Sequence, residues 1–327
     1  MTLEPAIRTI DLVKEYPGDV HALDGVTFDV REGEVFALLG PNGAGKTTTV
    51  KILTTLSRPT SGEARVAGFD VVREAGNVRQ AIGVVAQRAG ADPTATGREN
   101  LSLQGRFFGM GGRALRTRID ALLELVGLTD AADRVTSTYS GGMTRRLDIA
   151  MGLVHGPRIL FLDEPTTGLD PEVRATMWDE IRRLAAQERL TILLTTHYLE
   201  EADRLAGRLV ILDAGRIVAA GTPDELKSGL RGDAIAIELG DGAAEPQVRA
   251  ALSRVPGVDE LRFDDRTVHL RVAAGASALP GVLSAIDATG VAVASATVSR
   301  PSLDDVYLRH TGRSFASAER TLQEAIR

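Results

Sequence analysis

Hydrophobic and polar residues alternate near the start of the chain and then gather into short apolar runs. Alternation over residues 7–13 and 26–30 predicts two strands, joined by a turn at residues 16–19. A further strand-like run covers residues 34–39. Two more runs are short and flanked by turn residues, which is typical of buried parallel strands, and these occupy residues 159–162 and 191–194. The first two hundred residues therefore predict an α/β unit.

Apolar residues recur at helical spacing in two longer stretches, residues 114–126 and 172–187, and each predicts an amphipathic helix. Residues 207–213 and 215–218 predict a hairpin that closes this part of the chain. Glycines at both ends of residues 229–232 indicate a hinge. We therefore expect one long domain before the hinge and a smaller one after it.

The part after the hinge has its own order of elements. It predicts a β-α-β-β-α-β arrangement, the ferredoxin-like or split βαβ motif, with strands at 234–239, 259–263, 267–273 and 291–298 and helices at 245–254 and 277–289. Residues 302–308 predict a capped helix. Residues beyond 314 are polar, and we expect them to be disordered. The predicted boundaries are 1–230 for the first domain, 231–314 for the second and 315–327 for the tail.

A phosphate-binding loop follows the strand at 34–39. The pattern G-x-x-x-x-G-K-[ST] is matched at every fixed position by Gly40, Pro41, Asn42, Gly43, Ala44, Gly45, Lys46, Thr47 and Thr48. Glycines allow the backbone to wrap an anion, and the helix predicted from Thr48 points its positive end into the loop. Lys46 would reach the terminal phosphates of a nucleotide, and the Thr47 hydroxyl would hold Mg²⁺.

Two carboxylates end the strand at 159–162. We expect Asp163 to lie beside the phosphate-loop strand and to hold Mg²⁺ directly or through water. Glu164 follows it and could activate a water for in-line attack on a γ-phosphate. An Asp-Glu pair at a strand end is often only a solvated turn, but a phosphate loop upstream favours the catalytic interpretation.

Composition narrows the possibilities without naming a function. The chain has 327 residues, 43% hydrophobic content and a net charge of −6, which suits a globular protein and does not suggest a nucleic-acid binder. It has no cysteine, so disulfides and thiolate metal sites are excluded. We expect no signal peptide at the N-terminus and no run long enough to span a bilayer. Any membrane role would then need a partner.

A second anion-binding surface is predicted at Ser140, Gly141 and Gly142, which precede a helical pattern at residues 145–154. A hydroxyl, a flexible backbone and the positive end of a helix can together bind a phosphate. Taken alone, the same residues would more simply be a capped helix after a tight turn. If both surfaces are real, either one nucleotide touches both or a second molecule completes each.

The order of these motifs along the chain resembles the nucleotide-binding domain of ATP-binding cassette (ABC) transporters. The likeness rests on the phosphate loop, Gln87, the Ser-Gly-Gly sequence at Ser140, the Asp163-Glu164 pair, residues 168–170 and His197, and it covers about residues 5–228. Within that family, residues 139–150, 195–203 and 301–308 resemble the daunorubicin-resistance type of multidrug-export ATPase. The resemblance implies a P-loop NTPase cassette with a mixed sheet and a helical subdomain at about 88–155, followed by a small α+β domain.

The resemblance also implies roles for single residues. Tyr16 matches the aromatic residue that stacks on adenine, and Gln87 matches the residue that contacts Mg²⁺ and the attacking water. Ser140, Gly141 and Gly142 match the signature that closes over the γ-phosphate of the opposite protomer. Asp170 matches the loop that bridges the two sites. His197 matches the switch histidine that holds the γ-phosphate and orients Glu164.

One departure concerns the signature itself. Its common form is Leu-Ser-Gly-Gly-Gln, whereas this chain has Tyr139 and Met143 at the two ends. Methionine lacks the amide donors and the carbonyl of glutamine, which puts contacts across a dimer through that residue in doubt. The phosphate-facing Ser-Gly-Gly sequence is intact.

The resemblance implies an ATPase that uses ATP and Mg²⁺ and closes as a head-to-tail dimer, with a homodimer permitted because one chain carries every motif. It implies a separately encoded transmembrane permease, a place on the cytoplasmic face of the cell membrane and no nucleic-acid partner. The first alternative is a soluble cassette ATPase that acts on ribosomes or DNA, although only one phosphate loop is present and fewer than a hundred residues separate it from the signature. The second is an ATP-binding regulator that does not hydrolyse, which the presence of Lys46, Asp163, Glu164 and His197 disfavours.

Overall fold

The computed structural model describes residues 4–230, 232–240 and 245–325. These residues form two compact units, one up to Ile217 and one from Val218 onward, and each unit is described by itself. The functional division expected at residue 230 stays a prediction.

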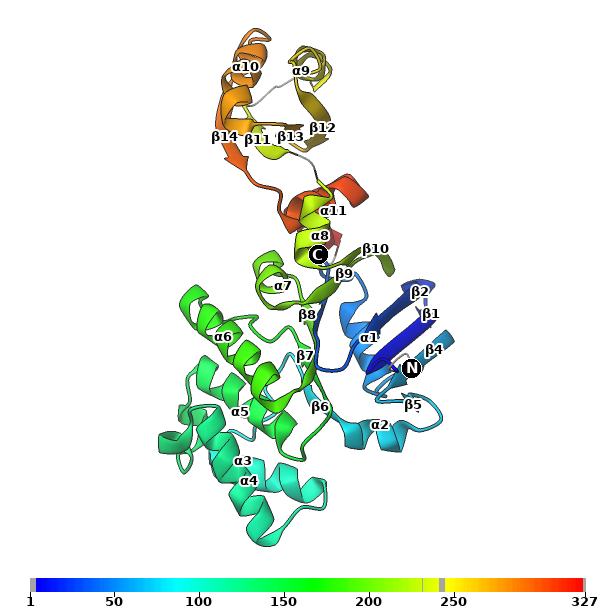
Figure 1. Ribbon diagram of the computed structural model, residues 1–327, viewed down its shortest axis with the longest axis vertical. Coiled ribbons are helices and arrows are strands. Elements are labelled where there is room, and N and C mark those ends of the chain that lie inside the picture. Colours follow the sequence, from blue (N-terminus) through cyan, green and yellow to red (C-terminus); the bar gives the residue numbers. More distant parts are fainter. Residues whose placement is uncertain (1–3, 231, 241–244, 326–327) are drawn as a thin grey trace. The chain divides into compact units, whose positions relative to one another are not determined.

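The first unit contains two sheets (Figure 1). The smaller one is antiparallel with the order β2-β1-β4-β5, formed by β1 (Ile7–Tyr16), β2 (Val20–Val30), β4 (Ser61–Val66) and β5 (Phe69–Asp70). Burial alternates along the end of β2, where Val26, Phe28 and Val30 are buried and the residues between them are exposed. This pattern confirms the two strands predicted near the N-terminus, although both are longer than predicted.

The larger sheet has the order β10-β9-β3-β8-β7-β6. Its strands are β3 (Val35–Leu39), β6 (Ile82–Val85), β7 (Ile159–Asp163), β8 (Thr191–Thr196), β9 (Arg208–Asp213) and β10 (Arg216–Gly221). Strands β9, β3, β8, β7 and β6 pair in parallel. Every residue of β7 and β8 is buried, which confirms that these apolar runs are central parallel strands.

One expectation about this sheet is wrong. Asp163 does not lie beside the phosphate-loop strand, because β8 lies between β3 and β7. In the two registers Thr195 of β8 pairs with Asp163 on one side and with Leu38 on the other. The apolar runs predict that these strands exist and are buried, but parallel strands joined by long crossovers need not lie in sequence order.

Seven α-helices of the first unit are described: α1 (Lys46–Leu53), α2 (Ala75–Ala81), α3 (Gly97–Phe107), α4 (Gly112–Leu125), α5 (Gly141–Leu153), α6 (Pro171–Glu188) and α7 (Leu199–Leu205). Helices α3, α4 and α5 contact one another and form a helical group (Figure 1). The apolar stripe of α4 is buried there, at Leu115, Ile119, Leu122 and Leu123. Among the described helices, none combines the length and the apolar character that crossing a bilayer requires.

The second unit confirms the β-α-β-β-α-β order. Its elements are β11 (Asp233–Leu239), α9 (Glu245–Leu252), β12 (Val258–Asp264), β13 (Thr267–Val272), α10 (Gly275–Asp287) and β14 (Val293–Ser299). The strands form an antiparallel sheet in the order β12-β13-β11-β14, which is the ferredoxin-like order. Its core includes Ile235, Ile237 and Leu270 from the sheet with Val248 and Ile286 from the helices.

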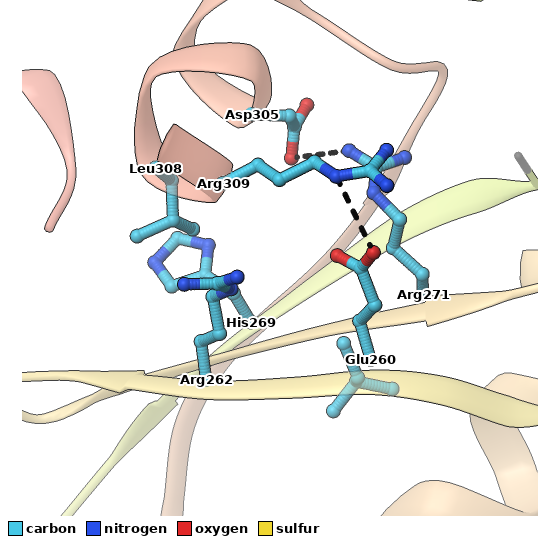
Figure 2. Close-up of a pocket in the computed structure, with 8 residues that line it drawn as sticks. Glu260, Arg262, His269, Arg271, Asp305, Leu308 and Arg309 are labelled. Atoms are coloured by element: carbon cyan, nitrogen blue, oxygen red, sulfur yellow. Dashed lines mark ion pairs between the residues drawn. The ribbon is translucent and has the colours of Figure 1, made fainter. Parts of the chain in front are cut away.

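Three further helices complete the second unit: α8 (Pro223–Ser228), α11 (Leu303–Thr311) and α12 (Phe315–Ala325). The capped helix expected at 302–308 is α11, and Ser302 forms a capping box with Asp305. Helix α11 is joined to the sheet by a nearly buried ion pair, in which Arg271 of β13 lies 3.1 Å from the Asp305 carboxylate (Figure 2).

The disordered tail expected beyond residue 314 is corrected. Helix α12 covers Phe315–Ala325. The Phe315 ring is 3% exposed and packs edge-on against Tyr307, with 5.1 Å between the ring centroids. A polar composition concealed this contact, because among the residues of the helix whose side chains are described, up to Arg320, Phe315 and Ala318 are the buried ones.

Candidate functional site

The phosphate loop, Gln87, Asp163, Glu164 and His197 all lie at the carboxyl edge of the parallel sheet of the first unit. Strand β3 runs into the phosphate loop, β7 ends at Asp163, and His197 follows the last residue of β8. Gln87 comes two residues after the end of β6. In open α/β sheets, ligands bind at this edge because the strand ends and the helix N-termini meet there.

The phosphate loop is a tight backbone turn around the start of α1. Gly45 has φ 105°, and a Cβ atom there would lie 2.6 Å from the Ala22 carbonyl oxygen, so only glycine fits. Lys46 is 4% exposed, and its Nζ donates hydrogen bonds to the carbonyl oxygens of Gly40 at 2.7 Å and Pro41 at 3.1 Å. The backbone of the loop therefore surrounds the ammonium group of Lys46, and Lys46 is also the first residue of α1.

Asp163 and Thr47 present oxygen atoms to each other across the sheet edge. Thr47 Oγ1 lies 3.4 Å from Asp163 Oδ1. The Thr195 hydroxyl donates to the same carboxylate oxygen at 2.6 Å and fixes its orientation. A hydroxyl beside a carboxylate is the donor set that Mg²⁺ uses when substrate phosphates supply the rest of its coordination, so these residues fit a magnesium–nucleotide site.

Glu164 is the centre of the cluster. It is 8% exposed, and its backbone has φ 48°, a left-handed conformation that a non-glycine residue adopts only when its surroundings enforce it. Lys46 Nζ lies 3.5 Å from Oε1, while Oε2 accepts hydrogen bonds from Gln87 Nε2 and Thr167 Oγ1, each at 3.2 Å. His197 Nδ1 lies 3.3 Å from Oε2.

These neighbours decide the charge of Glu164. Burial acts to raise its pKa, but the contact with His197 and the positive charge of Lys46 outweigh burial, so the pKa lies below its ordinary value. The carboxylate is therefore ionised at neutral pH. An ionised carboxylate with a fixed direction can accept a proton from a water molecule.

The signature residues form a separate, exposed surface. Ser140 is the N-cap of α5, and its Oγ accepts a hydrogen bond from Met143 N at 3.3 Å. Asp170 is the N-cap of α6 and accepts from Val173 N at 3.0 Å. The two caps are neighbours, because a Cβ on Gly141 would lie 3.4 Å from Leu169 Cδ2 and one on Gly142 would lie 2.9 Å from Val173 Cγ1. The structure thus brings Ser140, Gly141, Gly142 and Asp170 together.

Tyr16 ends β1 and is partly exposed. Lys14 Nζ lies 4.9 Å from the centre of its ring. Tyr16 pairs with Val20 at the turn between β1 and β2, and β2 then passes against the phosphate loop at Ala22. The aromatic residue expected to stack on adenine therefore lies on the hairpin that borders the loop.

Sequence reasoning missed several residues that hold this cluster. Thr195 is fully buried, and besides binding Asp163 it accepts a hydrogen bond from Glu164 N at 3.0 Å. Glu201 is also fully buried and accepts from Thr166 Oγ1 at 2.7 Å and Trp178 Nε1 at 2.9 Å. For Thr195 the signal in the sequence is a polar residue directly after the apolar run of residues 191–194, whereas Glu201 stands in a mixed stretch and gives no such signal.

Comparison with known proteins places this arrangement in a family. The family model described as "ABC transporter" matches residues 23–167, and the model "ATP-binding protein DrrA1-3-like, C-terminal domain" matches residues 221–311. The daunorubicin resistance ATP-binding protein DrrA2 of Streptomyces coeruleorubidus is 47% identical over 96% of this chain and 97% of that protein. The chain belongs to the ABC ATPase family. The Nod factor export ATP-binding protein I of Paraburkholderia xenovorans is 40% identical over 95% of this chain and 99% of that protein.

Solved structures agree with this ABC cassette. CbiO1 from Clostridium perfringens, part of an ABC transporter complex, has a TM-score of 0.65 and 25% identity and covers 77% of this chain and 96% of that chain. The ATP-binding cassette MJ0796, a dimer in a post-hydrolysis state bound to ADP and Pi, has a TM-score of 0.59 and 26% identity, with 66% and 98% covered. The predicted fold, family and ATPase activity are therefore confirmed.

Proposed function

We propose that this ABC ATPase drives a separate membrane permease that exports drugs, antibiotics or lipids. The observation that carries the proposal is the convergence of Lys46, Gln87 and His197 on the carboxylate of Glu164. Such a cluster suits hydrolysis rather than nucleotide binding alone. Export is supported by relatives whose names include daunorubicin resistance and Nod factor export.

In this proposal the phosphate loop and Lys46 hold the β- and γ-phosphates of ATP. Thr47, Gln87 and Asp163 would hold Mg²⁺, which would supply positive charge beside the phosphates. Glu164 removes a proton from the attacking water, and His197 holds the γ-phosphate and orients Glu164. Most of the catalysis is positioning and charge neutralisation.

A second copy of the chain completes each site. Ser140, Gly141, Gly142 and Asp170 are exposed or partly exposed and lie together, apart from Glu164, so they are available to the nucleotide of an opposite protomer. Two ATP molecules then bridge a head-to-tail homodimer. Closure gains free energy from ATP only because the triphosphate contacts both protomers in the closed state.

A groove of the first unit offers a surface for the permease. It has a volume of about 890 Å³, and its lining includes Leu56, Val84, Phe107 and Phe108. Leu56 is 73% exposed and Phe107 is 77% exposed, which is unusual for large apolar side chains. The groove also contains Ile82 of β6, the strand that leads to Gln87. A permease helix seated there would place the ATPase on the cytoplasmic face of the cell membrane.

Inverted membrane vesicles test this function. The chain is co-expressed with a candidate permease, and ATP-dependent uptake of daunorubicin is measured against the same vesicles with Glu164→Gln. Uptake that requires both proteins and an intact Glu164 supports drug export. Uptake of a labelled lipid but not of the drug would mean that the exported molecule is a lipid. No uptake despite rapid ATP hydrolysis would contradict export. Nothing in the comparisons favours the soluble alternative.

A further inference from the structure

Arg145 is a buried arginine on α5, the helix that begins directly after Ser140. It is 7% exposed, and all three of its guanidinium nitrogens donate to backbone carbonyl oxygens. Nε donates to Pro165 at 2.7 Å, Nη1 to Ala86 at 2.6 Å and Nη2 to Asp163 at 3.2 Å. The planar guanidinium therefore joins three separate segments of the chain at one point.

Two of these carbonyl groups flank the strained residue of the site. Asp163 and Pro165 are the neighbours of Glu164, whose φ of 48° needs support from its surroundings. The third carbonyl belongs to Ala86, the residue before Gln87, and Gln87 itself donates to Glu164 Oε2 at 3.2 Å. One side chain thus fixes the backbone on both sides of the proposed base and beside the glutamine that contacts it.

A second buried residue of α5 holds the same segment further along. Asp148 lies one turn after Arg145, is 6% exposed and accepts a hydrogen bond from Gly90 N at 3.0 Å. Helix α5 therefore bonds to the segment that contains Gln87 at two points, Ala86 before it and Gly90 after it. A displacement of α5 cannot leave this segment in place without breaking the part-buried hydrogen bonds that join Arg145 to Ala86 and Asp148 to Gly90.

We propose that Arg145 is a positioning residue that couples the opposite ATP site to Glu164 of its own protomer. The inference rests on the proposed function, in which Ser140 touches the partner's nucleotide and Glu164 activates water. Ser140 caps the N-terminus of α5, and Arg145 lies inside the same helix. A nucleotide that pulls on Ser140 shifts α5 as a rigid element, and Arg145 passes that shift to the backbone at Glu164 and Gln87. ATP binding at one site then changes the catalytic geometry of the other site.

Arg146 supplies a matched control on the same helix. It is the adjacent arginine, but within the described residues its side chain pairs with Glu180 of α6, to which Nε donates at 2.8 Å, and not with a residue of the site. Replacing either arginine with lysine keeps the charge and the helix propensity and removes the planar fork. An effect specific to Arg145→Lys therefore cannot come from a general loss of helix stability or of charge on α5.

The test is an ATP titration of steady-state hydrolysis in the purified full-length chain. We expect Arg145→Lys to lower kcat about 10- to 100-fold, the loss that a small misplacement of a catalytic group causes. In a Glu164→Gln background, ATP affinity and ATP-induced dimer formation should stay within about twofold of the parent, since among the described residues the guanidinium of Arg145 bonds to backbone carbonyls of Ala86, Asp163 and Pro165 and not to the phosphate loop. The Hill coefficient for ATP should lie above 1 in the wild type and fall to 1 in Arg145→Lys, while Arg146→Lys should leave kcat and the Hill coefficient unchanged.

Three results would overturn the inference. They are an unchanged kcat in folded Arg145→Lys, an equal loss in Arg146→Lys, or a wild-type Hill coefficient of 1. Arg145→Gln is the second variant if the lysine form does not fold, and because its shorter, neutral side chain keeps only two N–H donors we expect a loss of kcat at least as large. Failure of the proposed function looks different, because Glu164→Gln would then hydrolyse ATP at the wild-type rate whatever happens at Arg145.

Discussion

The two halves of the proposed ATP site are built in different ways. The half around Glu164 is buried and linked by contacts within one chain, including those of Glu164 with Lys46 and His197. The half around Ser140 and Asp170 is exposed, and each of these side chains makes a local bond that caps its own helix. The first half is preorganised in a single chain, whereas the capping side chains of the second half are exposed and accessible to a second molecule.

The buried half therefore supplies the catalytic groups, and the exposed half makes their action depend on a second protomer. A preorganised cluster can hold a water molecule and a phosphate with little reorganisation, which is the main source of catalytic power in phosphoryl transfer. An exposed pair of helix caps contributes only when a nucleotide arrives from another protomer. Hydrolysis should therefore depend on dimer formation, even though most of the catalytic groups already lie in one chain.

The largest expected effect is that of Glu164→Gln. Loss of the base should slow ATP hydrolysis by about 10²–10⁴-fold, because Lys46, Gln87 and His197 all contact the Glu164 carboxylate. ATP binding should persist, and the dimer should accumulate in its closed form. The measurements are phosphate release and size-exclusion chromatography with ATP. Glu172→Gln, an exposed substitution on α6, is the control. Turnover at the wild-type rate would remove Glu164 as the base.

Lys46→Ala should act mainly on binding. The ammonium group supplies charge-assisted hydrogen bonds to the phosphates, each worth about 1.5–3 kcal/mol, so ATP affinity should fall about 10- to 100-fold. Equilibrium binding of a fluorescent ATP analogue measures the change. Lys51→Ala is the matched control, because Lys51 lies on the same helix and is exposed. An unchanged affinity in Lys46→Ala would contradict the phosphate-loop assignment.

Ser140→Ala should show what the exposed half of the site contributes to hydrolysis independently of the buried half. The single variant should bind ATP normally and hydrolyse it slowly, with a stability loss of about 1 kcal/mol from the missing N-cap. Mixing it with Lys46→Ala should restore part of the activity, because one site of the mixed dimer then combines an intact Lys46 with an intact Ser140. Phosphate release as a function of mixing ratio measures this. A mixture no more active than its two components would mean that the halves do not work across a dimer.

For the buried half of the site, the sequence predicted which residues take part but not how the strands that carry them are ordered. The phosphate loop, Asp163 and Glu164 were found because their residue types and their strand–loop–helix context are specific to phosphate chemistry. The place of β8 between β3 and β7 was missed, and with it the bridging role of Thr195. Strand order depends on how crossovers pack, which local pattern does not encode. Tyr16, Gln87 and His197 carry little signal alone, and their roles came from the resemblance and stay predictions.

The buried carboxyl group of Glu201 gives a smaller effect that depends on pH. Burial raises the pKa of Glu201 above its ordinary value, even though hydrogen bonds from Thr196, Thr166 and Trp178 oppose the change. The folded state therefore keeps a proton that the unfolded state releases near pH 4.5, and stability is lost as the pH rises through the range between the two pKa values. Glu201→Gln removes this dependence.

Thermal unfolding of Glu201→Gln and the wild type from pH 4 to pH 8 tests the sign. The stability of the variant relative to the wild type should be lowest at acid pH and should rise toward neutral pH, where the wild type must bury a charge. Glu200→Gln changes an exposed neighbour on α7 and should show no such trend. A difference that is constant with pH would mean that Glu201 titrates alike in the folded and unfolded states.

The smallest effect on the nucleotide site is expected from deleting residues 231–327. The ferredoxin-like sheet and its helices have a core of their own, which includes Ile235, Val248 and Leu270. No proposed ATP contact lies in this part of the chain, so ATP affinity should stay within about twofold, the range expected when no contact to the ligand is lost. We expect the deletion to weaken dimer formation instead, because a separate domain with its own order of elements suits assembly or regulation. Sedimentation with and without ATP measures this, and an unchanged dimer together with unchanged transport would leave the second domain without an assembly role.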